Sequence, residues 1–153
     1  MSDAPYKASL RVAVASDHAG LALKDELKAL LARLKVDATD LGTNSSASVD
    51  YPDFAHALAK GVSEKRFDAG ILVCGTGIGM SIAANRHPEI RAALCTDPYS
   101  ARMTRLHNDA NVLCLGARVV GGGLAEEIVT AFFTTSFEGG RHAGRVAKLN
   151  PSA

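Results

Sequence analysis

Hydrophobic and polar positions divide the chain into short apolar runs and longer amphipathic segments, which follow one another from end to end. The apolar runs predict β-strands over residues 10–15, 36–41, 69–74, 90–96 and 112–116. The segments between them predict helices over residues 23–34, 51–65, 82–85, 98–107 and 121–135. In the first of these helices Leu23, Leu27 and Leu30 share one face. Asp97 followed by Pro98 is typical of a helix start.

Strands that alternate with helices predict an α/β fold, in which a parallel sheet carries helices on both of its faces. The length of 153 residues suits a single domain over residues 1–153. Ligands of such folds bind beyond the carboxyl ends of the strands. The residues just after the strands are therefore the first candidates for a site, and they are Asp17, His18, Asp50, Tyr51, Cys74 and Arg118.

The segment 74–81 (CGTGIGMS) is the most informative of these positions, because it places three glycines between a buried strand and a helix. Backbone N–H groups in such a loop can bind an anion and would favour the thiolate of Cys74. A dinucleotide fingerprint is a second interpretation, although Met80 replaces its third glycine and Asp97, where a ribose-binding acid is expected, should cap a helix. A structural turn is the third, with Cys74 as an ordinary buried thiol.

Two polar pairs each have a functional and a structural interpretation. Asp17 and His18 either contact a ligand or combine a helix cap with a surface histidine. His107 and Asn108 either belong to a site or simply end a helix.

The C-terminal tail, residues 138–153, contains Arg141 and Arg145, which are four positions apart. In a helical tail both guanidinium groups would lie on one face and could bind one phosphate. The alternative is a solvated basic tail.

Composition and charge exclude several other functions. A formal net charge of +1, without runs of lysine or arginine, argues against a nucleic-acid partner. No apolar stretch approaches the length of a membrane span, and residues 1–9 do not resemble a signal peptide. Three widely spaced cysteines argue against disulfides and for the reducing cytoplasm. Neither they nor the five histidines show metal-ligand spacing.

Five segments together resemble the type B ribose-5-phosphate isomerases, a family that also includes galactose-6-phosphate isomerase subunits and allose-6-phosphate isomerases. They are residues 16–20 (SDHAG), 50–52 (DYP), 74–85 (CGTGIGMSIAAN), 107–112 (HNDANV) and 138–142 (EGGRH). The resemblance extends from about residue 10 to about residue 146. It implies a Rossmann-like three-layer α/β/α sandwich with a five-stranded parallel sheet, a homodimer or dimer of dimers, and neither metal nor cofactor.

The resemblance also implies a role for each matching residue. Cys74 corresponds to the base that moves a proton between C1 and C2, with Thr76 assisting proton transfer between the two oxygens. His107, expected beside Cys74, corresponds to the acid that opens the sugar ring. Another branch of the family has a glutamate base where this chain has Met80, so Cys74 indicates the cysteine branch. The residues expected to contact substrate are Asp17, His18, Tyr51, Gly75, Thr76, Gly77, Ile78, Gly79, Asn108, Arg118, Arg141 and Arg145. The glycine loop would hold the enediolate, and the arginines would hold the phosphate, some of them across a dimer interface.

The activity that the resemblance implies is that of an aldose–ketose isomerase, an intramolecular oxidoreductase. It would interconvert D-ribose 5-phosphate and D-ribulose 5-phosphate in the pentose phosphate pathway. Two alternatives stay open: an isomerase of a six-carbon sugar phosphate, such as allose 6-phosphate or galactose 6-phosphate, and a non-catalytic phosphosugar-binding protein. Apolar residues near the C-terminus predict at least a homodimer, because a lone domain would leave them exposed. These are Val119, Val120, Phe132, Phe133 and Phe137.

Overall fold

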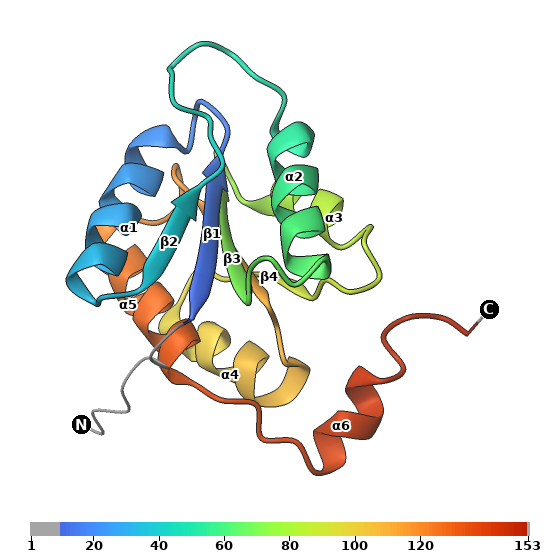
Figure 1. Ribbon diagram of the computed structural model, residues 1–153. Coiled ribbons are helices and arrows are strands. Elements are labelled where there is room, and N and C mark those ends of the chain that lie inside the picture. Colours follow the sequence, from blue (N-terminus) through green and yellow to red (C-terminus); the bar gives the residue numbers. More distant parts are fainter. Residues whose placement is uncertain (1–9, 153) are drawn as a thin grey trace.

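The computed structural model describes residues 10–152, which form a five-stranded parallel sheet with helices on both faces (Figure 1). Residues 1–9, in which the sequence predicts no signal peptide, lie outside the described residues. The strands are β1 (Arg11–Ser16), β2 (Asp37–Asp40), β3 (Ala69–Cys74), β4 (Ala92–Leu94) and β5 (Val112–Gly116). The helices are α1 (Leu21–Arg33), α2 (Tyr51–Ser63), α3 (Ile78–Ala84), α4 (Pro98–Asn108), α5 (Gly122–Thr134) and α6 (Arg141–Val146). The predicted Rossmann-like three-layer α/β/α sandwich is confirmed.

The strands lie in the order β2-β1-β3-β5-β4, so that β3 is central. Its side chains alternate between two hydrophobic clusters, one on each face of the sheet. Ile71 and Val73 face the cluster covered by α1, α4 and α5, whereas Leu72 and Cys74 face the cluster covered by α2 and α3. Because both faces of β3 are buried, the strand is a continuous apolar run in the sequence. The core therefore holds the backbone of Cys74 in place.

Two elements differ in extent from their predictions. The predicted strand over residues 90–96 is reduced to Ala92–Leu94 at the sheet edge. There the side chain of Asn85 replaces a neighbouring strand, because its Nδ2 donates to Ala92 O at 2.9 Å and its Oδ1 accepts from Ala92 N at 2.8 Å. Helix α3 begins at Ile78 instead of residue 82, because a left-handed Gly77 starts the helix inside the glycine loop.

The apolar residues near the C-terminus do not form the exposed surface that the sequence predicts. Val120 and Phe132 are buried in the cluster with α1, α4 and α5, and Phe133 packs against that cluster. Among the residues of that prediction Val119 is exposed. The predicted surface is wrong because α5 turns its aromatic face inward. Large apolar side chains are exposed elsewhere, on α3, β4 and α4, and these are Ile78, Ile82, Leu94 and Tyr99.

The parallel sheet has two distinct ends. Strands β1, β3 and β5 finish at its carboxyl end, where the loops after them lie together. Helix α4 starts after β4 and runs back over about 16 Å, at 1.5 Å per residue, so that its last turn lies at the amino end. Helix α6 packs against α4 there and extends away from the sheet (Figure 1). Between residues 10 and 152, no helix combines the length and the hydropathy that crossing a bilayer requires.

Candidate active site

Cys74 lies at the carboxyl end of β3, where the core ends and the glycine loop begins. Its side chain is only 5% exposed, and its Sγ accepts a hydrogen bond from the Gly77 N–H at 3.1 Å. Gly77 has a φ of 77°, and a Cβ there would lie 2.6 Å from Leu94 Cδ1 and 2.9 Å from the Leu115 carbonyl carbon. Glycine alone fits this position, and it turns an N–H toward the sulfur. A thiolate would strengthen that hydrogen bond.

The rest of the glycine loop presents polar groups to solvent. Thr76 Oγ1 accepts from the Ile78 N–H at 3.3 Å, which leaves the hydroxyl hydrogen to donate to a ligand. Gly79 and Met80 occupy the first turn of α3, where N–H groups have no acceptor inside the helix. The Tyr51 ring lies over Gly79, where a Cβ would come within 2.5 Å of its Cζ. The loop is therefore a cradle of donors beside a thiol.

A guanidinium group reaches this cradle from the loop after β5. The Arg118 N–H donates to Gly75 O at 3.0 Å, so the two loops are joined by their backbones. A Cβ at Gly75 would lie 3.3 Å from Arg118 Nη1, which shows that the side chain crosses the glycine. Arg118 is exposed and can bind an anion in the cradle.

The loop after β1 lies against the end of β3. The Asp17 N–H donates to Val73 O at 3.2 Å. One oxygen of the buried Asp17 carboxylate accepts from the Gly20 N–H at 3.1 Å, so this aspartate does form a local turn, as the structural interpretation requires. His18 Nδ1 accepts from the Val49 N–H at 3.2 Å. The neutral His18 ring therefore carries its hydrogen on Nε2 and can donate it to a ligand.

His107 and Asn108 form the last turn of α4, at the amino end of the sheet. Within one chain they do not lie beside Cys74, which is at the carboxyl end (Figure 1). The expectation of a single site with His107 beside Cys74 is therefore wrong for one chain. The physical reason is the eleven residues of α4, which carry the chain back across the sheet.

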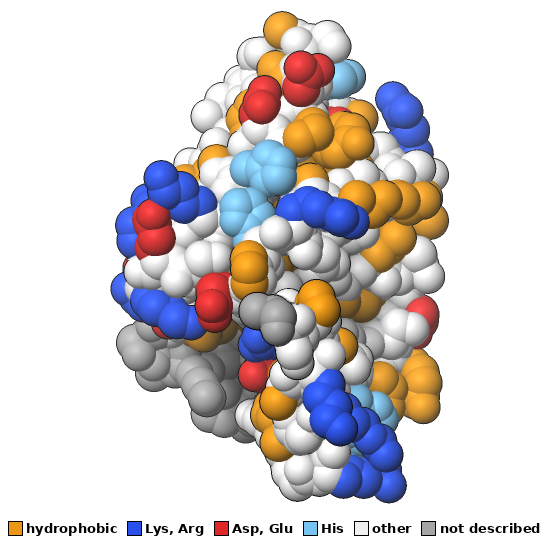
Figure 2. Space-filling view, turned by 90° about the vertical axis from the view of Figure 1, so that its right-hand side faces the viewer, with side chains coloured by type: hydrophobic (Ala, Val, Ile, Leu, Met, Phe, Trp, Pro, Cys, Tyr) orange, Lys and Arg blue, Asp and Glu red, His pale blue; other side chains and the backbone are white. Residues whose placement is uncertain are grey.

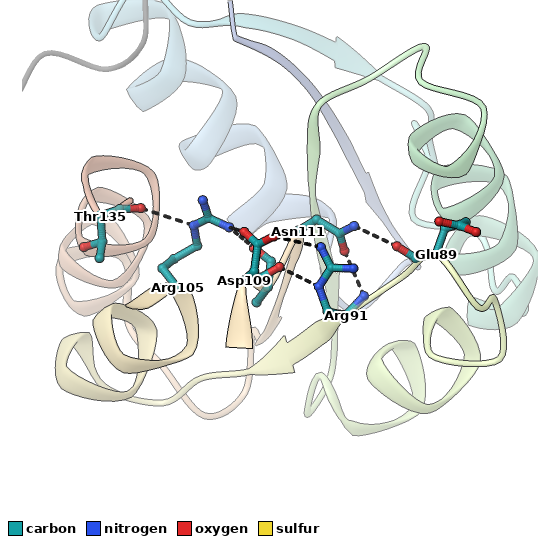
Figure 3. Close-up of polar contacts among 7 residues, drawn as sticks. Glu89, Arg91, Arg105, Asp109, Asn111 and Thr135 are labelled. Carbon is teal, nitrogen blue, oxygen red and sulfur yellow. Dashed lines mark hydrogen bonds and ion pairs between the residues drawn. The ribbon is translucent and has the colours of Figure 1, made fainter. Parts of the chain in front are cut away.

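A network of ion pairs holds the end of α4 (Figure 3). Asp109 has a φ of 46° and ends the helix. Its carboxylate pairs with Arg91 and Arg105, each at 3.2 Å. Arg105 Nε also donates to Thr135 O at 3.2 Å. Because this network joins α4 to β4 and to the end of α5, it fixes the position of His107.

Several polar side chains surround His107. Its ring stacks on that of His142, with centroids 4.2 Å apart and 16° between the planes. Glu138 Oε2 lies 3.9 Å from His107 Nε2 and 3.5 Å from His142 Nε2. Burial, followed by the neighbouring His107, lowers the pKa of His142, so its ring is neutral at pH 7. Asn108 and Arg145 line a cavity of about 180 Å³ beside these rings.

The predicted arginine pair lies on α6, next to this cavity. Arg141 and Arg145 are both exposed and one helical turn apart, as the sequence predicts for a helical tail. Arg141 Nε donates to His142 Nε2 at 3.4 Å. The two guanidinium groups and the cavity could together bind a phosphate.

The structure thus divides the expected residues into two groups. The Cys74 group, at the carboxyl end, contains Asp17, His18, Tyr51, Cys74, Gly75, Thr76, Gly77, Ile78, Gly79 and Arg118. The His107 group, at the amino end, contains His107, Asn108, Arg141 and Arg145. Sequence patterns alone indicate no role for Glu138 and His142, although both belong to segment 138–142. Their spacing of four residues was the one feature of the sequence that could have indicated that the two side chains meet.

The other two thiols are buried, as predicted. Burial raises the pKa of Cys95 to about 11, and Asp97 adds to the effect. Burial likewise raises the pKa of the Cys114 thiol. Both are therefore protonated at neutral pH and inert as bases.

Comparison with known proteins identifies relatives along nearly the whole chain. Residues 12–149 match the family model described as Ribose/Galactose Isomerase. Ribose-5-phosphate isomerase B of Escherichia coli (strain K12) is 49% identical over 139 residues, which are 91% of this chain and 93% of the relative. D-erythrulose-4-phosphate isomerase of Pectobacterium atrosepticum is 42% identical, over 92% of this chain and 93% of the relative. The structure of Clostridium thermocellum ribose-5-phosphate isomerase B is similar with a TM-score of 0.91 and 50% identity, covering 92% of this chain and 95% of that one.

Proposed function

The chain belongs to the ribose/galactose isomerase family of sugar-phosphate isomerases, and we propose that it interconverts D-ribose 5-phosphate and D-ribulose 5-phosphate. The observation that carries this proposal is the Cys74 sulfur, held at 3.1 Å from a glycine-loop N–H. Aldose–ketose isomerisation needs a base beside a carbon acid and donors for an oxyanion. The glycine loop and its cysteine can provide both.

In the proposed mechanism the Cys74 thiolate removes the proton from C2 of the open-chain aldose. The electron pair of that C–H bond forms the C1=C2 double bond, and the carbonyl oxygen on C1 becomes the negative oxygen of an enediolate. Glycine-loop N–H groups stabilise this charge, and loss of one such donor costs on the order of 3 kcal/mol in other enzymes. The Thr76 hydroxyl moves a proton from the C2 oxygen to the C1 oxygen. Cys74 then returns its proton to C1, which gives the ketose.

A second copy of the chain would supply the ring-opening acid. Ribose 5-phosphate is mostly a closed ring, so an acid–base group must first free its aldehyde. His107 suits this task, but its own chain holds it at the opposite end of the sheet from Cys74. We infer that the site is completed in a homodimer, with Arg141 and Arg145 of the same copy binding the phosphate.

The exposed apolar side chains support this dimer. Ile78 and Ile82 on α3 lie next to the glycine loop, and Leu94 contacts Gly77 within it. Tyr99, at the start of α4, is 67% exposed. Figure 2 faces the right-hand side of Figure 1, and it shows hydrophobic side chains gathered on that face and basic side chains at its lower end, where α6 lies. A two-fold dimer could cover the apolar surfaces and bring the basic end of each copy to the Cys74 group of the other.

A panel of sugar phosphates tests the proposed substrate. The purified protein is expected to show its highest kcat/KM with ribose 5-phosphate and ribulose 5-phosphate. A relative named as a D-erythrulose-4-phosphate isomerase makes a four-carbon substrate the second candidate, and allose 6-phosphate and galactose 6-phosphate cover the six-carbon one. A higher kcat/KM for any of these would reassign the substrate. Binding of all of them without turnover would indicate a phosphosugar-binding protein.

The proposed setting is the pentose phosphate pathway in the cytoplasm. The three free cysteines suit a reducing compartment. The acid–base residues of the two groups can account for isomerisation by themselves, so we propose no cofactor for it.

A further inference from the structure

Three side chains at the junction of α4 and α6 bring nitrogen and oxygen atoms close together. They are His107, Glu138 and His142, and one ligand atom of each lies within 4.8 Å of the other two. The Nε2 atoms of His107 and His142 lie 3.9 Å and 3.5 Å from Glu138 Oε2. Two imidazoles and one carboxylate are a common ligand set of zinc and related ions.

The backbone holds these three residues in place. The Glu138 N–H donates to Leu106 O at 3.1 Å, which ties the carboxylate to the last turn of α4. Gly139 and Gly140 both have positive φ, and the turn they form allows the His142 N–H to donate to Gly139 O at 3.0 Å. His142 is only 4% exposed, so its ring has little freedom to move. The backbone of Glu138 and the ring of His142 are therefore held in place, whereas the half-exposed His107 ring can turn.

The distances suit a tetrahedral ion after a small adjustment. Bonds of roughly 2.0–2.1 Å to a tetrahedral zinc ion place neighbouring ligand atoms roughly 3.4 Å apart. The distance of 3.5 Å from His142 Nε2 to Glu138 Oε2 is close to this value, and the distance of 3.9 Å from His107 Nε2 to the same oxygen is slightly longer. The His107 ring, which now stacks on His142, would have to rotate out of the stack to direct its Nε2 at the same ion, and its half-exposed position allows this. Three protein ligands would leave the fourth position for water or a phosphate oxygen.

Electrostatic contributions of both signs act on an ion here. Glu138 and the carbonyl end of α4 attract a cation. The Nε2 atom of His142 accepts a hydrogen bond from Arg141 Nε, so this nitrogen carries a lone pair that a metal could take in place of that hydrogen bond. Arg141 and Arg145 repel a cation, and Arg141 would have to release His142. The arginines therefore weaken the site without removing any of its ligands.

We propose that His107, Glu138 and His142 form a binding site for a divalent transition-metal ion such as Zn²⁺, and that the ion inhibits the enzyme. Inhibition follows because a metal on His107 Nε2 withholds that nitrogen from opening the sugar ring. This inhibitory part rests on the proposed function, whereas binding of the ion does not.

Calorimetric titration of the full-length protein with Zn²⁺, in phosphate-free buffer at pH 7.5, tests the binding. We expect one ion per chain, and we expect Glu138→Gln and His142→Asn each to weaken binding at least tenfold. The matched control is His87→Asn, because His87 Nε2 lies 2.8 Å from His56 Nδ1 in a histidine pair elsewhere on the surface. The control should bind like the wild type. Absence of saturable binding below millimolar Zn²⁺, or loss of binding in the His87 variant, would overturn the proposal.

Arg141→Ala provides a test in which the affinities for Zn²⁺ and for inorganic phosphate should change in opposite directions. The variant should bind Zn²⁺ more tightly, because a positive neighbour is gone and His142 is freed, and it should bind inorganic phosphate more weakly. A parallel loss of both affinities would contradict the site. Zn²⁺ should also slow turnover of ribose 5-phosphate in the wild type and act at least tenfold more weakly on Glu138→Gln. Binding without inhibition would remove the inhibitory part, and a protein without any turnover would instead contradict the proposed function.

Discussion

Three cysteine residues with different surroundings show how position decides the chemistry of a side chain. Cys95 and Cys114 are enclosed by the core, and burial raises the pKa of both thiols. Cys74 also packs against the core, but its sulfur lies at the end of the strand and receives an N–H from the glycine loop. Of the three, Cys74 alone combines a donor to its sulfur with access to the loops that would hold a ligand.

Cys74→Ala is therefore expected to abolish exchange of the transferable substrate proton with deuterated water. Proton transfer by a positioned side chain contributes roughly 10²–10⁴-fold, and turnover should fall by at least that factor. NMR of deuterium incorporation measures the exchange directly. Cys95→Ala is the control and should retain exchange, because the raised pKa of Cys95 keeps that thiol protonated. Near wild-type exchange in Cys74→Ala would require a different base.

His107→Asn should separate ring opening from proton transfer. With ribose 5-phosphate, kcat should fall roughly 10²–10⁴-fold, because bound closed rings are no longer opened. With ribulose 5-phosphate, which forms no stable ring, kcat should fall much less. The two kcat/KM values must still change by the same factor, because the overall equilibrium constant fixes their ratio. Initial-rate measurements in both directions check this, and an equal loss of kcat in both would place His107 in the proton-transfer step.

At the scale of single elements, helix α1 illustrates how a buried charge positions a loop. The Lys24 side chain is fully buried, and its Nζ contacts Asp40 Oδ1 at 2.7 Å and also donates to Thr43 O. Lys28 contacts the other oxygen of Asp40 at the same distance, but it is 38% exposed. Lys24 therefore joins α1 to the end of β2 and to the loop that carries Val49, the hydrogen-bond partner of His18.

Lys24→Met is expected to destabilise the protein by about 3 kcal/mol, because it removes the buried one of the two lysine partners of Asp40 and leaves the carbonyl of Thr43 without its donor. Lys28→Met, the matched control, should cost less than about 1 kcal/mol, since its amine is partly exposed to solvent. Urea denaturation at pH 7 measures both. Equal losses in the two variants would contradict a special role for the buried lysine.

The titration of Asp40 determines how the stability lost in Lys24→Met depends on pH. Burial alone would raise the pKa of its carboxyl, but hydrogen bonds from Lys24, Lys28 and the Gly42 N–H together hold it below its usual value. A depressed folded-state pKa stabilises the protein fully above the unfolded value of about 3.9 and loses that contribution as the pH falls through the folded value. The difference in the free energy of unfolding between the wild type and Lys24→Met should therefore become smaller only below about pH 4.

Several elements were predictable from the sequence because their signals are local. The apolar run of β3, the glycine loop, and the Asp97 cap of α4, whose Oδ1 accepts from the Ser100 N–H at 2.7 Å, all depend on neighbouring residues. The short β4 was not predictable, because on the side away from β5 its hydrogen-bonding partner is the side chain of Asn85 and not another strand. The start of α3 depends on the left-handed backbone of Gly77, which the glycine pattern permits but does not specify.

At the scale of the whole molecule, the missing information concerned which residues meet in space. The sequence predicted that some of the arginines act across a dimer interface, but it did not separate His107 from Cys74, although a helix that follows a parallel strand must run back to the amino end of the sheet. The burial of Phe132 in the cluster shared by α1, α4 and α5 was also beyond the sequence, because it depends on how α5 docks. Assembly of the two groups into one site is therefore a question about two chains.

Mixing two variants that are each impaired with ribose 5-phosphate as the substrate answers that question. If each site combines Cys74 of one copy with His107 of the other, a dimer of Cys74→Ala with His107→Asn contains one doubly damaged site and one intact site. Random exchange at equal concentrations makes half of the dimers mixed, so about one quarter of the sites should be active. Steady-state turnover after denaturation and joint refolding of the two variants measures this recovery, and each variant refolded alone is the control. If both residues of a site came from the same chain, every site in the mixture would carry a substitution and activity would not recover.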